Sequence, residues 1–203
     1  MGINKHILIA VPTYETIYPE TFKSIYDLKN SLGVKLDFEF VKGYDCARAR
    51  NLIAKKSIEG GYDNVLMVDS DVILPDNVID RFARLDYDMF LGYSPRKNDP
   101  TMAEIYKDGH FGYDKENRYS VEELEKLKDS VDLIKINGGS FGCAYIRTDI
   151  FNHLHYPYFQ YINYPNGQLL SEDLYFCSEV RNKHYKIYLD PKVRCRHIGK
   201  HIV

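Results

Sequence analysis

The sequence lacks the features that mark membrane, disulfide-rich and nucleic-acid-binding proteins. None of its apolar runs approaches the roughly 20 residues that cross a bilayer. It has no long lysine or arginine block and a formal net charge of -2, so bulk electrostatic attraction to nucleic acid is not indicated. Tryptophan is absent, and the four cysteines show no CxxC spacing, which indicates neither a zinc knuckle nor a disulfide framework.

The N-terminus and the cysteines together indicate a cytoplasmic protein. The first part of the chain has too short an apolar run for a signal peptide and no small-residue cleavage site. Free thiols are typical of a reducing compartment. With 203 residues, of which 44% are apolar, the chain is long enough to bury a core, and we expect one domain over 1–203.

Apolar periodicity predicts alternating strands and helices in the first half of the chain. Continuous apolar runs indicate buried parallel strands, whereas apolar residues three or four apart indicate helices. Strands are expected at 6–14, 34–43, 64–72 and 87–94, and helices at 18–33, 45–61 and 74–86. This alternation predicts an α/β fold with right-handed crossovers, whose ligands bind beyond the carboxyl ends of the strands.

The second half of the chain has a less regular pattern. Glycines within 103–120 predict a hairpin turn, and Ser171 is placed to cap a helix within 169–185. The other expected elements are a charged helix at 121–130, two strand pieces in 132–151 joined at Gly138 and Gly139, and a last strand at 186–190.

An acidic pair, Asp69 and Asp71, ends the third expected strand, in the segment VLMVDSDVILP. Two carboxylates this close repel each other unless a cation or a shared proton lies between them. Carboxylate oxygens are ligands that Mg²⁺ and Mn²⁺ accept while keeping positions open for phosphate oxygens. The pair therefore predicts a metal site, and a turn in which one aspartate caps the next helix is the simpler alternative.

A second chemistry also fits this acidic pair. The segment DSDV resembles the opening motif of haloacid-dehalogenase-like phosphatases, in which the first aspartate attacks a phosphate, and Asp69 would then be the nucleophile. Two features weigh against this alternative. Two expected strands precede the motif, and no later acidic pair is accompanied by a convincing upstream lysine.

A set of motifs in a particular order resembles the metal-dependent glycosyltransferases of the GT-A fold. The sequence is similar to compact bacterial and phage members near glycosyltransferase family two, over about Ile7 to Lys200. The resemblance implies a mixed, mostly parallel GT-A (Rossmann-like) sheet flanked by helices, with a nucleotide-binding half at 1–95 and an acceptor and catalytic half at 96–203. The motifs are VPTY at 11–14, ARARN at 47–51, NVLMVDSDVILP at 64–75, NGGSFGCAYIR at 137–147, SEDLYFC at 171–177 and RHIGKH at 196–201.

The resemblance implies that Mn²⁺ or Mg²⁺ neutralises the diphosphate of a nucleotide-sugar donor, by family habit a UDP-sugar. The metal ligands would be Asp69, Asp71 and His197, with His201 as the alternative histidine. Arg50 competes with Arg48 for a place in the donor site. The residues expected around the nucleotide and its sugar are Pro12, Thr13, Tyr14, Arg48, Asn51, Asp69, Ser70, Gly138, Gly139, Arg194 and Lys200.

The resemblance also implies an inverting transfer with an acidic base. Asp173 would deprotonate the acceptor hydroxyl, and Glu172 would orient the acceptor or a neighbouring loop. The acceptor class stays open among glycan, protein side chain, metabolite and modified DNA base. The non-enzyme alternative is a sugar-nucleotide or glycan-binding module, although binding alone does not require a base.

Overall fold

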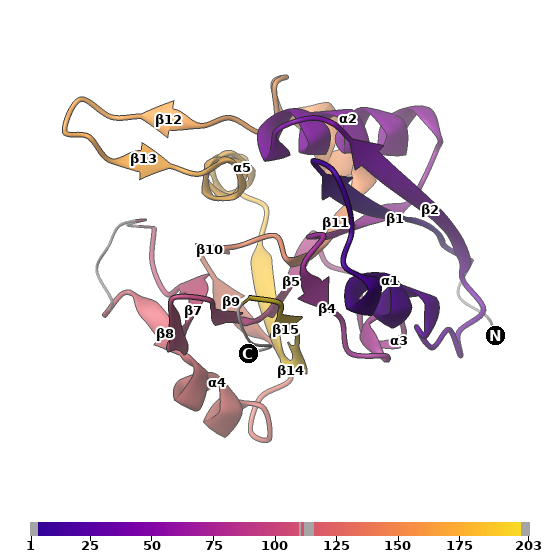
Figure 1. Ribbon diagram of the computed structural model, residues 1–203, viewed down its shortest axis with the longest axis horizontal. Coiled ribbons are helices and arrows are strands. Elements are labelled where there is room, and N and C mark those ends of the chain that lie inside the picture. Colours follow the sequence, from indigo (N-terminus) through magenta and orange to yellow (C-terminus); the bar gives the residue numbers. More distant parts are fainter. Residues whose placement is uncertain (1–3, 110, 112–115, 200–203) are drawn as a thin grey trace.

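The computed structural model describes residues 4–109, 111 and 116–199. Its centre is a seven-stranded sheet in the order β2-β1-β3-β11-β5-β14-β9 (Figure 1). Within the described residues, no helix has both the length and the apolar character needed to span a bilayer. The strands are β1 His6–Thr13, β2 Lys35–Lys42, β3 Asn64–Val68, β5 Met89–Tyr93, β9 Ile134–Ile136, β11 Cys143–Arg147 and β14 Ile187–Arg194.

Because several strands run in the same direction, their carboxyl ends lie at the same edge of the sheet. β1 is parallel to β2 and β3, and β5 is parallel to β14. β11 lies antiparallel between β3 and β5, and β9 is antiparallel to β14, so five of these seven strands run the same way. The edge formed by the residues that follow β1, β3 and β5 is here called the carboxyl rim. The prediction of a mixed, mostly parallel α/β sheet flanked by helices is confirmed.

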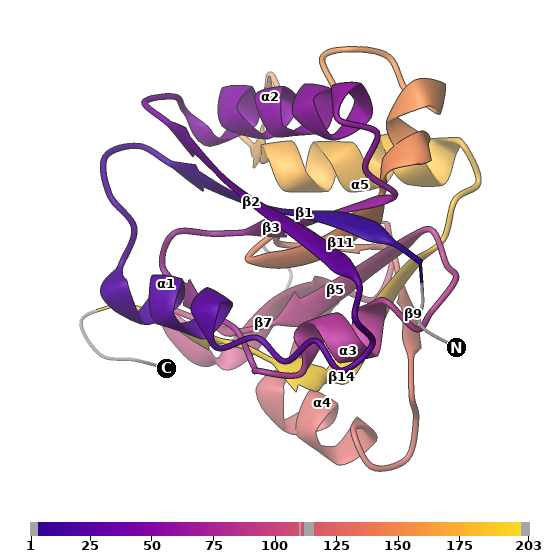
Figure 2. The ribbon, with the colours of Figure 1, turned by 90° about the vertical axis from the view of Figure 1, so that its right-hand side faces the viewer.

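Helices cover both faces of the sheet (Figure 2). α2 (Cys46–Glu59), the 3-10 helix η1 (Thr148–His153) and α5 (Glu172–Asn182) pack on one face, where apolar side chains of all three join one core cluster. α1 (Pro19–Tyr26) and α3 (Val78–Phe82) pack on the other face. The Asp45 side chain caps α2 as predicted, because it accepts a hydrogen bond from the Arg48 amide at 3.0 Å.

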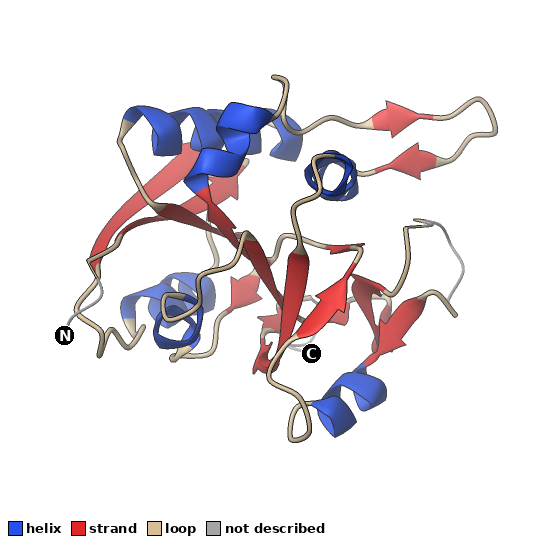
Figure 3. Ribbon diagram, turned by 180° about the vertical axis from the view of Figure 1, so that it is seen from behind, coloured by secondary structure: helices blue, strands red, loops and turns tan. Residues whose placement is uncertain are grey.

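The second half of the chain adds smaller pairings. β7 (Asp99–Tyr106) pairs with β6 (Pro95–Arg96), β8 (Arg118–Ser120) and β10 (Gly138–Gly139), all antiparallel. The predicted hairpin at 103–120 corresponds to β7 and β8, and part of its turn lies outside the described residues. α4 (Val121–Leu127) follows β8. A second hairpin, β12 (Ile162–Asn163) and β13 (Leu169–Leu170), projects beside the start of α5 (Figure 3).

Two predicted elements are shorter than expected around the acidic pair. The strand expected at 64–72 ends at Val68, and β4 (Val72–Ile73) follows a turn. β4 does not join the main sheet, since it pairs antiparallel with β15 (Arg196–His197) near the end of the chain. The helix expected at 74–86 is also shorter, because only α3 forms within that range. The predicted halves at 1–95 and 96–203 both contribute strands to the main sheet, and the division stays a prediction.

The ion pair between α3 and β14 generates a stability prediction. Arg81 donates two hydrogen bonds, at 2.6 and 2.9 Å, to the Asp190 carboxylate, which is fully buried. Arg81→Ala leaves that carboxylate without its main partner, so we expect a loss of about 3–5 kcal/mol in unfolding free energy, measured by urea denaturation. Arg84→Ala, at an exposed position just after α3, is the matched control and should cost less than about 0.5 kcal/mol. Equal losses in the two variants would contradict this account.

Candidate functional site

The acidic pair lies at the carboxyl rim, where β3 ends. The Asp69 amide donates to the Gly142 carbonyl at 3.3 Å, and the Val72 amide returns to the Asp69 carbonyl at 3.1 Å. This turn carries Asp69 and Asp71 out of the buried strand, and their side chains are 31% and 23% exposed. Both carboxylates therefore keep contact with solvent, while backbone hydrogen bonds fix the turn that carries them.

His197 reaches Asp71 through backbone pairing near the end of the chain. β15 pairs with β4 so that His197 lies opposite Val72, and the Ile198 amide donates to the Asp71 carbonyl at 2.8 Å. His197 Nε2 consequently lies 3.4 Å from Asp71 Oδ1, while His197 Nδ1 faces the Pro95 carbonyl at 3.4 Å. A histidine and an aspartate from distant parts of the sequence are thus neighbours at the rim.

Lys97 is the second partner of Asp71. Its ammonium forms an ion pair with Asp71 Oδ2. Burial raises the pKa of Asp71, but the hydrogen bonds and charges of His197 and Lys97 outweigh burial, so the pKa lies below its ordinary value. Asp71 is therefore ionised at neutral pH. Lys97 was missed by the sequence analysis, because no pattern connects a lysine in the turn between β6 and β7 to the acidic pair.

Arg50 of α2 joins the acidic pair to the start of α5. It donates from Nη2 to Asp69 Oδ1 at 2.7 Å and from Nη1 to Glu172 Oε1 at 2.5 Å. The Arg50 side chain is 3% exposed and that of Glu172 is 8% exposed. Burial lowers the pKa of Arg50, but the nearby carboxylates raise it by more, so the guanidinium stays charged.

Asp173 follows Glu172 in the first turn of α5. Its carboxylate accepts hydrogen bonds from the Ser171 hydroxyl and, at 2.8 Å, from the Leu174 amide. Burial, opposed in part by the charge of Arg50, raises the pKa of Asp173 to about 6. A carboxylate with this pKa is ionised at neutral pH yet basic enough to accept a proton, as a general base must.

The residues predicted to border the nucleotide base lie where β1 ends. Pro12 and Thr13 are the last two residues of β1 and are buried, and Tyr14 beyond them is 70% exposed. Ser70 lies between the two aspartates, and its carbonyl accepts a hydrogen bond from the Tyr18 amide at 3.1 Å. The structure thus brings Pro12, Thr13, Tyr14 and Ser70 to the same rim as the acidic pair.

The structure does not bring Arg48 or Asn51 into the group around the acidic pair. Arg48 is exposed, with its guanidinium 4.5 Å from the centre of the Tyr44 ring. Asn51 is buried. Its side-chain nitrogen donates to the carbonyls of Ala47 and Phe159, at 2.9 and 2.8 Å. Its side-chain oxygen accepts from the backbone amides of Tyr158 and Phe159, at 2.8 and 3.2 Å. Arg50, weighed against Arg48 from the sequence, is the arginine of this helix that contacts the acidic groups.

Other predicted donor residues have partners of their own. Gly138 and Gly139 form β10, where an added Cβ at Gly139 would lie 2.6 Å from the Ile105 side chain, so close packing explains at least this small residue. Arg194 donates to Glu125 of α4 at 2.9 Å. Lys200 and His201 lie outside the described residues, and their predicted roles stay predictions.

The residues beside Asp71 fit a divalent cation only as a partial site. Within the described part of the chain, no three His, Cys, Asp or Glu side chains are grouped closely enough to hold a metal ion. Asp71 and His197 nevertheless supply an oxygen and a nitrogen at one place, with the second imidazole nitrogen against a backbone carbonyl, as metal-binding histidines commonly have. Magnesium sites often use one or two protein ligands and complete the shell with substrate phosphates and water.

Comparison with solved structures places the chain in a fold class. No protein-family model matches the sequence, and no curated protein matches it. The structure of A197 from STIV superposes with a TM-score of 0.67 at 17% identity, covering 96% of this chain and 86% of that chain. The structure of GalNAc-T7 with UDP, GalNAc and Mn²⁺ superposes with a TM-score of 0.54 at 13% identity, covering 97% of this chain but only 44% of that chain.

These likenesses show the fold alone, and the chain has the GT-A fold. A third structure, the inositol-1-phosphate CTP transferase from T. maritima, has a TM-score of 0.46 at 10% identity, covering 93% of this chain and 86% of that chain, a likeness too loose to argue from. The predicted GT-A architecture is therefore confirmed, whereas the roles of individual residues rest on the geometry described above.

The buried contacts of Arg50 generate the next prediction. Arg50→Leu removes the partner of two carboxylates, of which Glu172 is almost fully buried, so we expect unfolding free energy to fall by about 3–5 kcal/mol. Arg48→Leu is the matched control two residues away on the exposed side and should change stability by less than about 0.5 kcal/mol. Urea denaturation of both variants measures the difference. A loss in Arg48→Leu as large as that in Arg50→Leu would contradict the assignment.

Proposed function

We propose that the protein is a metal-dependent glycosyltransferase that moves a sugar from a nucleotide-diphosphate donor, expected to be a UDP-sugar, to an acceptor hydroxyl. The observation that carries this proposal is the pairing of β15 with β4, which sets His197 beside Asp71 at the carboxyl rim of a GT-A sheet. The imidazole and the carboxylate offer nitrogen and oxygen ligands to a divalent cation that also binds phosphate oxygens.

The donor half of the proposed site is built around the acidic pair. Asp71 and His197 would hold Mn²⁺ or Mg²⁺, which supplies Lewis-acid stabilisation of a leaving diphosphate when bound. Asp69, oriented by Arg50, would face the ribose or the metal with its remaining oxygen. The exposed ring of Tyr14 is available to stack on the base. The other residues proposed to border the donor are Pro12, Thr13, Ser70, Gly138, Gly139, Arg194 and Lys200.

The acceptor half of the proposed site is the start of α5. Asp173 would take the proton of the acceptor hydroxyl, and its pKa of about 6 suits this role at neutral pH. Glu172 is held by Arg50, so its contribution would be to orient the acceptor or fix the base. An enzymic base on the acceptor side supports an inverting transfer, because the acceptor then attacks directly from the face opposite the leaving group.

The phosphatase alternative rests on the DSDV motif alone. Arg50 binds Asp69 Oδ1, so a nucleophilic Asp69 would have to attack through its other oxygen. A binding module without turnover would not need a base at the start of α5, and the raised pKa of Asp173 has no evident part in binding alone. The experiments below separate these alternatives from a transferase.

The proposed metal ligand gives the first functional prediction. Asp71→Ala should lower the Mn²⁺-dependent affinity for UDP by about 10-fold or more, measured by isothermal titration calorimetry. The fold should survive, because the Asp71 side chain is partly exposed and its backbone pairing is kept. Asp76→Ala is the matched control, since this exposed aspartate pairs with Lys29 on the surface. Unchanged UDP affinity and metal response in folded Asp71→Ala would remove Asp71 from the donor site.

Turnover of simple phosphate esters by the wild type would favour the phosphatase.

The proposed base gives the second functional prediction. Asp173→Asn keeps size and hydrogen bonding but cannot accept a proton, so sugar transfer should fall by roughly 10²-fold or more while UDP affinity is retained. Wild-type transfer should decline as pH falls through about 6, where the Asp173 carboxylate gains its proton, and the variant should lack that decline. Transfer is measured as acceptor-dependent UDP release, with Asp132→Asn at an exposed position as the control. Near wild-type transfer in Asp173→Asn would exclude this base.

The same raised pKa predicts how Asp173 affects stability. The folded protein holds the proton of Asp173 more tightly than the unfolded chain, so this carboxyl's contribution to stability is present at low pH and is lost as pH rises through about 6. Asp173→Asn should therefore be more stable relative to wild type at pH values above 6 than below 4. Thermal melting across that pH range measures the difference, and a variant that loses stability most at high pH would contradict the sign.

A further inference from the structure

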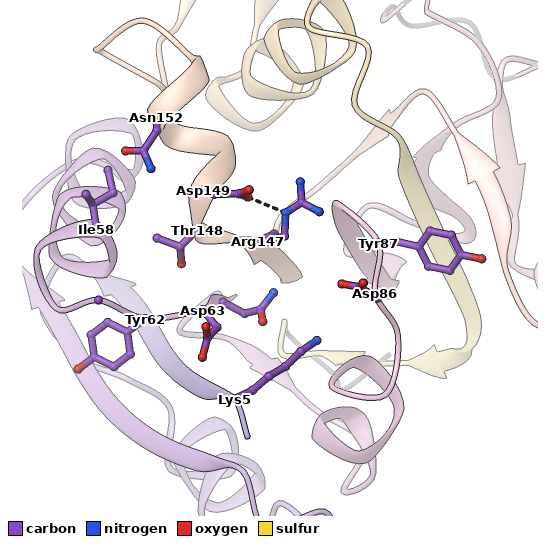
Figure 4. A pocket seen from close by; sticks show the side chains of 12 residues that line it. Lys5, Ile58, Tyr62, Asp63, Asp86, Tyr87, Arg147, Thr148, Asp149 and Asn152 are labelled. Atoms are coloured by element: carbon purple, nitrogen blue, oxygen red, sulfur yellow. Dashed lines mark hydrogen bonds and ion pairs between the residues drawn. The ribbon is translucent and has the colours of Figure 1, made fainter. Parts of the chain in front are cut away.

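Two features at the margin of the sheet take no part in the proposed transfer reaction. One is a hollow of about 460 Å³ at the starts of β1 and β3 (Figure 4). Its aspartates Asp63, Asp86 and Asp149 are exposed to solvent, and Arg147 is paired with Asp149 at 2.6 Å, so this lining favours no single class of ligand. The other feature is the outer edge of β2, which carries a more specific pattern of backbone groups and side chains.

The outer edge of β2 is long and open. β2 pairs with β1 over eight residues, and no other strand of the described residues pairs with it. Figure 2 looks onto this edge, with β2 in front of the other strands of the sheet. Proteins usually protect such edges with very short strands, bulges or proline, because an open edge can pair with another chain. The opposite outer strand, β9, has only three residues, whereas β2 has eight and contains no proline.

The hydrogen bonds to β1 show which backbone groups of β2 point outward. The Lys35 amide donates to the Lys5 carbonyl at 2.9 Å, and the Gly43 amide donates to the Thr13 carbonyl at 3.0 Å. Successive residues of a strand direct their amides and carbonyls to alternate edges, so the odd-numbered residues of β2 are bonded to β1. The residues whose amides and carbonyls point outward are therefore Leu36, Phe38, Phe40 and Lys42.

Two phenylalanines lie beside this open edge. The Phe38 and Phe40 side chains are 38% and 37% exposed, and their rings meet edge to face with 4.5 Å between the ring centres. They lie on the same face of the sheet as Leu36, which packs against the core under α1 and α3. Adjacent exposed apolar side chains mark a surface that another molecule covers more often than single scattered ones do.

The carboxylates of β2 do not protect the edge, because each is engaged within the chain. On the face toward α2, Asp37 bonds the His6 ring at 2.8 Å and accepts from the Tyr62 hydroxyl at 2.9 Å. Glu39 forms an ion pair with Lys56 of α2 at 2.7 Å. An incoming strand would therefore meet carboxylates whose charge is partly compensated.

We propose that β2 pairs with β2 of a second copy of this chain, antiparallel about a twofold axis through Glu39. An antiparallel pair bonds only where outward groups of both strands meet, so even-numbered residues must lie opposite even-numbered residues. An axis through Glu39 satisfies this condition. It sets Phe38 opposite the partner's Phe40 and Leu36 opposite the partner's Lys42, on both sides of the axis. Four phenylalanine rings then meet on one face as cross-strand aromatic pairs, which stabilise sheets.

Charge disfavours the neighbouring register. An axis through Phe38 would also match the outward backbone groups, but it would set Asp37 opposite the partner's Glu39 twice. With the axis through Glu39, only the two copies of Glu39 face each other, and each has its own Lys56 as counterion. Axes further along the strand pair fewer residues. The strand is therefore complementary to itself in backbone, rings and charge, which favours a second copy as its partner.

Sedimentation velocity of the intact chain from about 1 µM to about 1 mM tests the proposal. We expect the mass to rise toward about 47 kDa, twice the 23.7 kDa of one chain. Amide hydrogen exchange at both ends of this range locates the contact. The Phe38 and Phe40 amides should exchange slowly only at high concentration, whereas the Asp37 and Glu39 amides should be protected throughout by β1. A monomer at all concentrations, or a dimer without added protection at Phe38 and Phe40, would overturn the proposal.

Two double variants test the register. Phe38→Lys with Phe40→Lys sets like charges opposite each other and should weaken the dimer by about 10-fold or more. Phe38→Lys with Phe40→Asp sets opposite charges there, so its affinity should stay closer to wild type. Both positions are exposed, so each monomer should stay folded, as circular dichroism would show.

The control for these variants is a third exposed aromatic residue. Tyr164→Lys changes a side chain that is 45% exposed in the turn between β12 and β13, and it should leave the dimer unchanged. Equal affinities of the two double variants would overturn the proposed register. A loss of affinity in Tyr164→Lys as large as that in Phe38→Lys with Phe40→Lys would overturn the assignment of the contact to β2.

Discussion

The buried charge of Arg50 is the constraint on which the arrangement of the carboxyl rim depends. A buried guanidinium costs several kcal/mol unless its charge and its hydrogen bonds are matched. Two carboxylates compensate the Arg50 charge, and each binds a different nitrogen of the guanidinium. One is Asp69, just after β3, and the other is Glu172, at the start of α5. Three elements, α2, β3 and α5, are therefore held to one another at the rim. Moving either carboxylate away would leave the guanidinium partly uncompensated in a site that water reaches poorly.

The same charge sets the chemistry of the neighbouring acid. Asp173 follows Glu172 directly, so the Arg50 contact also fixes where Asp173 stands. Burial alone pushes the pKa of Asp173 upward, and Arg50 acts in the opposite direction. The balance is a carboxyl that is ionised at neutral pH but retains more basicity than an exposed aspartate. In the proposed reaction, a residue that never touches substrate would thus position the base and tune its proton affinity.

Sequence periodicity was sufficient for the strands of the first half of the chain and for part of the site, whereas it did not give the strand order or the antiparallel β11 between β3 and β5. Continuous apolar runs end at Thr13 and Val68. Because the two strands were expected to be parallel, the polar residues that follow them were expected at one edge of the sheet. The helical spacing of α2 could also have distinguished the two arginines. Arg50 lies on the same face of the helix as the buried Ala47 and Ala54, whereas Arg48 does not. Which carboxylates Arg50 meets could not be inferred, since Glu172 is 122 residues away in sequence. The two-residue pairing of β15 with β4 is likewise too short to leave a periodic signal.

The two aspartates of the acidic pair differ in what holds them, and this difference bears on how a ligand would enter. Asp69 is held by Arg50, which is 3% exposed and cannot turn away without burying an unmatched charge. Asp71 is held by Lys97, which is 44% exposed on a flexible stem, and surface ion pairs of this kind are weak and readily exchanged. Repulsion between the carboxylates is thus relieved by two cations of the protein itself. Of these two cations, Lys97 can be displaced from Asp71 by an incoming cation at a small cost in free energy, whereas Arg50 cannot leave Asp69 at such a cost. Asp71 is therefore the carboxylate that can exchange its partner.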